Sequence, residues 1–155
     1  MPSQEATGSE RRVLKLLRGV DWGGPTSRAL SSLNISRHSH QRWGEIDFLV
    51  IGPPGLLVIE VKGGLVSCSG GIWKFTDRMG REVRRSKAPI VQAKDAYFSL
   101  MQHYVEPELG AGFSRRVPTG FCVVLAGMGR DDIEERLVGP ETPIELVGSK
   151  EDLAN

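Results

Sequence analysis

Two aliphatic segments joined by a stiff turn constrain the fold of this chain most. Residues Glu45–Ile51 and Leu56–Val61 are rich in β-branched and aliphatic side chains, and Gly52-Pro53-Pro54-Gly55 separates them. Short apolar segments bounded by Gly and Pro are typical of β-strands, and two of them in succession predict a hairpin. The second segment is almost continuously aliphatic, which is typical of a central strand covered on both faces.

Four charged residues lie at the ends of these strands that are remote from the turn. A hairpin centred on Pro53-Pro54 pairs Asp47 with Glu60 and Glu45 with Lys62. Directly opposite residues share one face of a sheet. A register shifted by one residue would instead place Asp47 against an aliphatic side chain on a buried face. The sequence therefore predicts all four charges on one face.

Like charges directly opposite each other destabilise a hairpin, so the pair of Asp47 and Glu60 needs a physical cause. A divalent cation is one, because Mg²⁺ is commonly held by one or two carboxylates, with waters and substrate phosphate as its other ligands. Lys62 would then act on the attacking water or on the charge that develops at phosphorus. The alternative is a structural salt-bridge cluster on an edge hairpin, and the continuous aliphatic run Leu56–Ile59 argues against an edge position.

The rest of the chain predicts an α/β (α+β) fold with a mixed sheet flanked by helices, in a single domain of residues 1–155 with its core at about 8–147. Ser9 is the expected N-cap of a first helix, and Pro89 suits the first turn of a second. The further expected elements are a weak strand at 28–36, a hairpin of Leu65–Ser67 with Ile72–Thr76, a helix to about Tyr104, a buried strand Thr119–Ala126 and a last strand Ile144–Val147.

The net charge of +1 conceals segregated charges. Residues 74–87 hold six basic and two acidic side chains, whereas residues 130–155 hold three basic and eight acidic ones. A basic stretch beside a metal site suits a phosphate backbone, and Phe75 within it is a candidate for stacking on bases. A solvated surface is the alternative. Trp73, just before the stretch, is expected to pack in the core first and to contact substrate second. The candidate nucleic-acid-binding residues are Lys74, Arg78, Arg81, Arg84, Arg85 and Lys87.

Asp47, followed thirteen positions later by Glu60-Val61-Lys62, resembles the PD-(D/E)xK nuclease superfamily. More narrowly, Glu45-Ile46-Asp47 with Gly55 and Val58–Gly63 is similar to the nuclease-related domain (NERD) family. Pro89-Ile90-Val91-Gln92 also resembles the Pro-x-x-Gln element of that family. The proline that often precedes the first aspartate in the superfamily is replaced here by Ile46, as is usual in the NERD form. The resemblance spans about residues 8–126.

This resemblance implies a restriction-endonuclease-like core and Mg²⁺- (or Mn²⁺-) dependent hydrolysis of phosphodiester bonds, in DNA rather than RNA. It implies a metal site of Asp47, Glu60 and the Val61 carbonyl, to which Glu10 of the first helix contributes. Lys62 and Gln92 would serve the attacking water or the phosphate, and Glu45 is a further catalytic candidate on the same face. Glu10 has an alternative as a first-turn acid favoured by the helix dipole, and Gln92 as an exposed helix residue.

Two other functions stay open at this stage. The first is a catalytically silent module that binds nucleic acid or docks to a fused or associated helicase or kinase domain, with this chain as the N-terminal module of a longer protein. The second is an assembly protein that docks through its acidic end. A homodimer is also open. The chain shows no secretory signal and no apolar run that would span a membrane, and its two cysteines suit a reducing compartment, so a cytoplasmic protein is expected.

Overall fold

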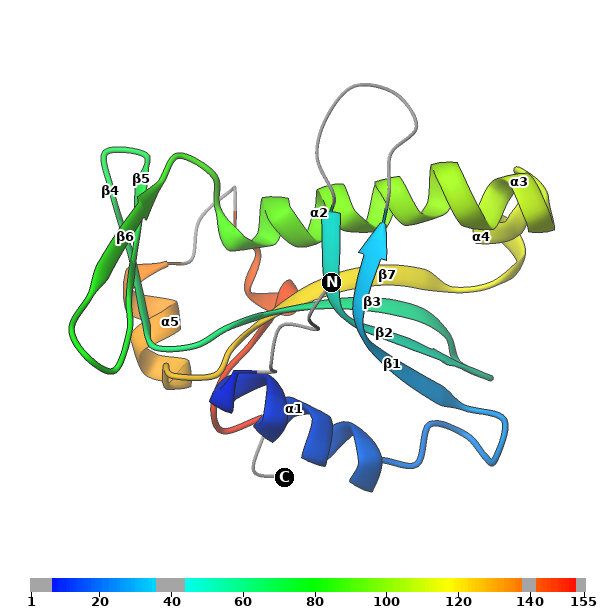
Figure 1. The fold of residues 1–155 in the computed structure, drawn as a ribbon, viewed down its shortest axis with the longest axis horizontal. Coiled ribbons are helices and arrows are strands. Elements are labelled where there is room, and N and C mark those ends of the chain that lie inside the picture. Colours follow the sequence, from blue (N-terminus) through cyan, green and yellow to red (C-terminus); the bar gives the residue numbers. More distant parts are fainter. Residues whose placement is uncertain (1–6, 36–43, 138–141, 153–155) are drawn as a thin grey trace.

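A computed structural model describes residues 7–35, 44–137 and 142–152, and Figure 1 shows a sheet with helices on both of its faces. In chain order the elements are α1 (Gly8–Gly19), β1 (Arg28–Ile35), β2 (Gly44–Gly52), β3 (Gly55–Lys62), β4 (Leu65–Ser69), β5 (Ile72–Thr76), β6 (Glu82–Arg85), α2 (Pro89–Leu100), a π-helical turn η1 (Met101–Val105), α3 (Glu106–Leu109), α4 (Phe113–Arg116), β7 (Thr119–Leu125), α5 (Arg130–Arg136), a 3-10 turn η2 (Ile144–Leu146) and β8 (Val147–Gly148).

The main sheet has the strand order β1-β2-β3-β7-β8. Strands β1, β2 and β3 pair antiparallel, whereas β7 pairs parallel with both β3 and β8. Strand β3 is therefore central, as its continuous aliphatic character predicts. Helix α1 covers one face of this sheet and α2 covers the other (Figure 1). The predicted fold class, a mixed sheet flanked by helices, is confirmed.

Apolar burial fixes both helices on the sheet. Val13 and Leu17 of α1 pack in one cluster with Phe48 and Ile59, and Leu100 of α2 packs in another. Each fully buried aliphatic side chain of this size contributes about 1.5–3 kcal/mol relative to exposure. Strands β2 and β3 thus lie between two packed layers, which position the side chains at the ends of these strands.

A second, three-stranded antiparallel sheet of β4, β5 and β6 follows β3 directly. Trp73 on β5 is only 5% exposed and packs with Ile90 of α2 and Val123 of β7. The Trp73 ring therefore belongs to the core, which confirms packing as its role and leaves it unavailable for base stacking. Strand β6 lies within the basic stretch and was not expected as a strand.

Three expected element boundaries are also wrong. The N-cap of α1 is Thr7 rather than Ser9, because the Thr7 hydroxyl accepts the Glu10 N–H and the Glu10 carboxylate accepts the Thr7 N–H, which forms a capping box. The helical segment that begins at Pro89 runs beyond Tyr104 through η1 and α3. The last expected strand, Ile144–Val147, is mostly the 3-10 turn η2, since a short apolar run does not distinguish a strand from a helical turn.

Candidate metal and catalytic site

The site begins at an irregularity shared by β1 and β2. The two strands keep one register from Arg28↔Ile51 to Ile35↔Gly44, but Ser32 and Asp47, which this register would pair, do not pair. Ser32 has φ +52° and is the only described residue other than glycine with a positive φ. A serine in this region is strained, and such strain concentrates at functional sites.

This irregularity changes which face the side chains of β2 present. Ile46 and Leu49 pack in the same apolar cluster, although residues three positions apart in a regular strand point to opposite faces. Phe48 and Val50 pack in the cluster on the α1 side. The strand therefore kinks at Asp47, and the Asp47 side chain lies where the regular alternation is interrupted.

The kink sends the Asp47 carboxylate to β3. The β2–β3 ladder runs from Gly52↔Gly55 to Phe48↔Ile59, in the predicted register, and its pairs stop there. Beyond it, Asp47 Oδ2 accepts the Val61 N–H at 2.7 Å, in place of a backbone carbonyl. The Lys62 carbonyl accepts the Ala126 N–H on the opposite edge of β3, so the backbone groups of Val61, its carbonyl included, face β2.

Glu60 and Lys62 lie together on β3, as the period of two predicts. The Lys62 Nζ lies 2.6 Å from Glu60 Oε1. Glu60 is buried at 9% exposure, and Lys62 is half-buried with its Nζ 5.9 Å from the centre of the Phe75 ring. The amine therefore neutralises one carboxylate of the site and is held by β5 of the second sheet.

The Asp47 carboxylate lies in an environment that disfavours its charged form. The pKa of Asp47 is raised to about 7, first by burial and next by the Glu60 charge. The Val61 N–H and the Lys62 ammonium act against this rise, and Glu10 adds a smaller rise. The charged form of Asp47 is thus disfavoured mainly by burial and further by neighbouring carboxylates, and an added cation would favour it.

Glu10, Gln92 and Glu45 are the remaining candidate site residues, and their environments differ from one another. Glu10 is close enough to Asp47 to affect its pKa, but its Oε1 accepts the Thr7 hydroxyl at 2.9 Å in the capping box. Gln92 is half-buried in the first turn of α2. Glu45 is exposed and pairs with Asn34 on β1. The expected cross-strand pair of Glu45 and Lys62 does not form, because the β2–β3 ladder ends before it reaches them.

The donor set fits a hard divalent cation. Within the described ranges, no group of three or more His, Cys, Asp or Glu side chains is arranged to hold a metal. The donors at the kink are instead two carboxylates, Asp47 and Glu60, with the Val61 carbonyl on the same edge. Mg²⁺ commonly binds through so few protein ligands and keeps waters or phosphate oxygens in its other positions.

Comparison with known families agrees with this geometry. A family model, the nuclease-related domain, matches residues 6–124, from the start of α1 to the end of the central strands. The chain belongs to the nuclease-related domain family. Neither a curated protein nor a solved structure matches this nuclease-related domain. No helix among its described residues is long and apolar enough to cross a membrane.

Of the six basic residues singled out in the sequence, three form surface ion pairs. Lys74 bonds Glu82 at 3.0 Å, Arg81 bonds Asp77 at 2.6 Å, and Lys87 bonds Asp95. Exposed pairs contribute only about 0–1 kcal/mol each, so a phosphate group can replace the carboxylates at little cost. The other three of these basic residues, Arg78, Arg84 and Arg85, are exposed.

Sequence reasoning missed Ser32. Its positive φ shapes the kink that presents Asp47, yet serine is not a typical residue for this backbone region, where Gly, Asn and Asp are the usual signals. The kink is visible only in which apolar clusters the residues around Asp47 join. The sequence alone does not give this information.

Proposed function

We propose that this nuclease-related domain is a Mg²⁺-dependent nuclease that hydrolyses phosphodiester bonds of nucleic acid, DNA in preference to RNA. One observation supports this most. Asp47, Glu60 and Lys62 converge at the end of the β2–β3 ladder, and the pKa of Asp47 is raised to about 7 by burial and by Glu60. Two carboxylates held together beside one amine suit a site that binds a divalent cation and a phosphate.

In this proposal Asp47, Glu60 and the Val61 carbonyl hold the metal, and Glu10 adds negative charge from α1. When bound, Mg²⁺ would supply charge stabilisation at the phosphate and a lowered pKa for a water ligand. The Val61 N–H fixes the Asp47 carboxylate at 2.7 Å, so this ligand is oriented before any metal arrives.

Lys62 has the second role. Its amine lies 2.6 Å from Glu60 and can turn from that carboxylate to the phosphate, where it would orient the attacking water or neutralise developing charge. Gln92 would contact the same water or phosphate from α2. Arg78, Arg84 and Arg85 would bind the phosphate backbone of the substrate, which positions it without reading its sequence.

The test is cleavage of linear and circular DNA by the purified domain in Mg²⁺ or Mn²⁺. Asp47→Ala and Lys62→Ala should each lower the rate by about 100-fold or more, because general acid–base and electrostatic contributions have that size. Lys15→Ala, an exposed change on α1, should cleave like the wild type. The proposal fails if the wild type yields no more product than Lys62→Ala, or if a chelator leaves cleavage unchanged.

The Glu60–Lys62 ion pair favours a second candidate, a catalytically silent nucleic-acid-binding module. A carboxylate already bonded to an amine at 2.6 Å has less need of a metal. Such a module would bind DNA equally well with and without chelator and would cleave none at any Mg²⁺ concentration. The same assay therefore separates the two candidates.

A further inference from the structure

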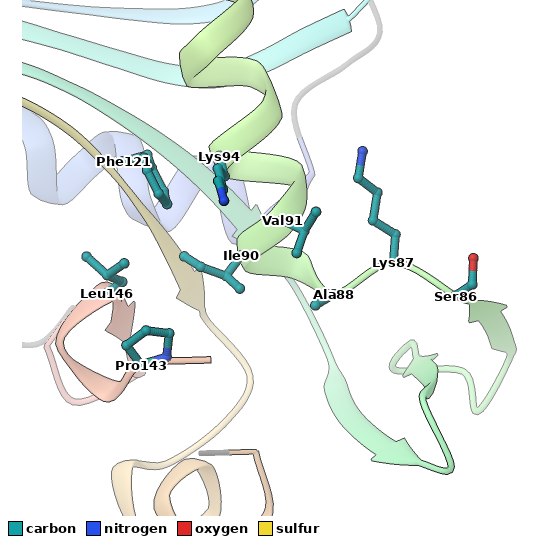
Figure 2. A pocket seen from close by; sticks show the side chains of 9 residues that line it. All are labelled: Ser86, Lys87, Ala88, Ile90, Val91, Lys94, Phe121, Pro143 and Leu146. Atoms are coloured by element: carbon teal, nitrogen blue, oxygen red, sulfur yellow. The ribbon is translucent and has the colours of Figure 1, made fainter. Parts of the chain in front are cut away.

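A cavity of about 680 Å³ lies beside the first turns of α2. Figure 2 shows it between the first turns of α2, β7 and η2. The residues that matter most in its lining are Lys87, Ile90, Val91, Lys94, Phe121 and Leu146. Its volume falls in the range of about 300–1,000 Å³ that is typical of ligand pockets.

Lys94, which lines the cavity, and Gln92, a catalytic candidate, lie on different sides of α2. Lys94 is two residues after Gln92, which places the two side chains about 200° apart around α2. Gln92 is the helix residue predicted to serve the catalytic site, whereas Lys94 lines the cavity. Within the described residues, the lining of the cavity shares none with the candidate metal site.

The charges in the cavity have one sign. Its described lining holds two amines, Lys87 and Lys94, and no acidic residue. Lys87 is bonded to Asp95, but Lys94 has no acidic partner in the part of the chain that the structure describes. Lys94 is exposed, and Figure 2 shows it among the residues that line the cavity with Phe121 and Ile90, so the cavity combines an amine with apolar side chains. The lining therefore suits an anion that carries a flat apolar group.

The apolar side chains offer such a group an aromatic surface. Phe121 is partly buried and packs at 5.5 Å, centre to centre, against Tyr97 on one side. Ile90 is buried, and the partly buried Leu146 and Val91 complete the apolar lining. Any nucleobase can stack on an aromatic ring, and an adjacent amine can bind the phosphate of the same nucleotide.

The second sheet leads along the chain from the candidate metal site to the cavity. Lys62 lies 5.9 Å from the Phe75 ring on β5, and Phe75 pairs with Val83 on β6. Strand β6 ends at Arg85, and the next two residues, Ser86 and Lys87, line the cavity. A strand of nucleic acid that follows the basic residues of β6 would reach the cavity directly.

We propose that this cavity binds an unpaired nucleotide of the substrate, with the base against Phe121 and the phosphate at Lys94. The identity of the polymer rests on the proposed nuclease function. A base within a duplex reaches a pocket only after it is unstacked and unpaired, which costs a few kcal/mol. The substrate class is therefore nucleic acid with a single-stranded tail or flap next to a duplex.

The test compares binding of two DNA probes in chelator, a blunt duplex and the same duplex with a short single-stranded thymidine tail. The wild type should bind the tailed probe more tightly. Lys94→Ala should remove this preference and lower the salt slope for the tailed probe by about 0.7, the value for one lost phosphate contact with a single strand. Phe121→Leu should weaken binding of the tailed probe roughly fivefold and leave the slope unchanged.

Lys15→Ala is the matched control, because Lys15 is exposed on α1, on the other face of the sheet. If Phe121→Leu does not fold, the arm with the exposed Lys94→Ala decides. The inference is overturned if Lys94→Ala binds the tailed probe like the wild type, or if it weakens both probes equally.

Failure of this inference is distinguishable from failure of the nuclease function. Cleavage in Mg²⁺ without a tail preference would overturn only the pocket. A tail preference that depends on Lys94, in a domain that cleaves nothing, would overturn only the nuclease.

Discussion

At the scale of single residues, one strained serine decides how an aspartate is presented. Ser32 at φ +52° lies opposite Asp47, and neither residue joins the ladder between β1 and β2. The Asp47 carboxylate consequently reaches the Val61 N–H, where a regular strand would offer a carbonyl. Strain of this kind costs about 1–3 kcal/mol, and the packed layers on both sides of β2 maintain it.

This strain predicts different effects on stability for two substitutions of Ser32. Ser32→Gly should leave stability close to that of the wild type, because Gly adopts a positive φ without a steric penalty. Ser32→Val should lower the free energy of unfolding by about 1–3 kcal/mol, because a β-branched residue is a poor fit in this region. Denaturant unfolding measures both.

Ser31→Val is the matched control for this prediction. Ser31 is also exposed on β1, but it pairs regularly with Phe48, so valine should be tolerated there. Equal stabilities of Ser31→Val and Ser32→Val would contradict the role of the kink.

The residues of the site were predictable to the extent that strands are regular. A period of two and the position of the turn suffice to bring Glu60 next to Lys62 and to place Asp47 beside them. The same regularity gave a wrong partner for Glu45, because the ladder ends at Phe48 and Ile59. A kink set by a residue on another strand leaves no signature in the local sequence.

At the scale of elements, the end of β3 is held by close backbone contacts. Gly64 has φ +74°, and a Cβ at this position would clash with the carbonyl oxygen of Thr76 at the end of β5. This contact lies two residues after Lys62. It fixes the position of the second sheet, whose Phe75 ring lies against the Lys62 amine.

Gly64→Ala should therefore destabilise the domain by more than the backbone conformation alone explains. Gly70→Ala is the matched control, since Gly70 also has a positive φ, of +56°, but has open space around its Cβ position. We expect a loss of about 1 kcal/mol for Gly70→Ala and at least about 2 kcal/mol for Gly64→Ala, measured by denaturant unfolding. Equal losses would show that the approach to Thr76 is unimportant.

Elements that rest on long periodic or apolar segments were predictable, and short ones were not. Strands β2, β3 and β7 and helices α1 and α2 follow from their apolar patterns. Strand β6 was missed, because its four residues, Glu82–Arg85, are exposed and three of them are charged. It forms through pairing with β5, which is a tertiary cause.

At the scale of the whole molecule, the fold brings charged side chains from several layers to the ends of strands β2 and β3 that are remote from their turn. Asp47 comes from β2, Glu60 and Lys62 come from β3, and Glu10 approaches from α1. The second sheet then supplies the aromatic contact to Lys62 and carries the exposed arginines of β6. The nuclease-related domain thereby places acidic side chains beside a basic surface, an arrangement on which the proposed nuclease function rests.

Thermal unfolding with and without divalent cation tests the central claim most directly. A cation bound only by the folded domain at 100 times its dissociation constant adds about 2.7 kcal/mol of stability. The melting temperature of the wild type should therefore rise in Mn²⁺ or Mg²⁺. Glu60→Gln should lose this rise, whereas Glu45→Gln, a change at an exposed position on β2, should retain it. No rise in the wild type, or an equal rise in Glu60→Gln, would contradict a metal site at Asp47 and Glu60.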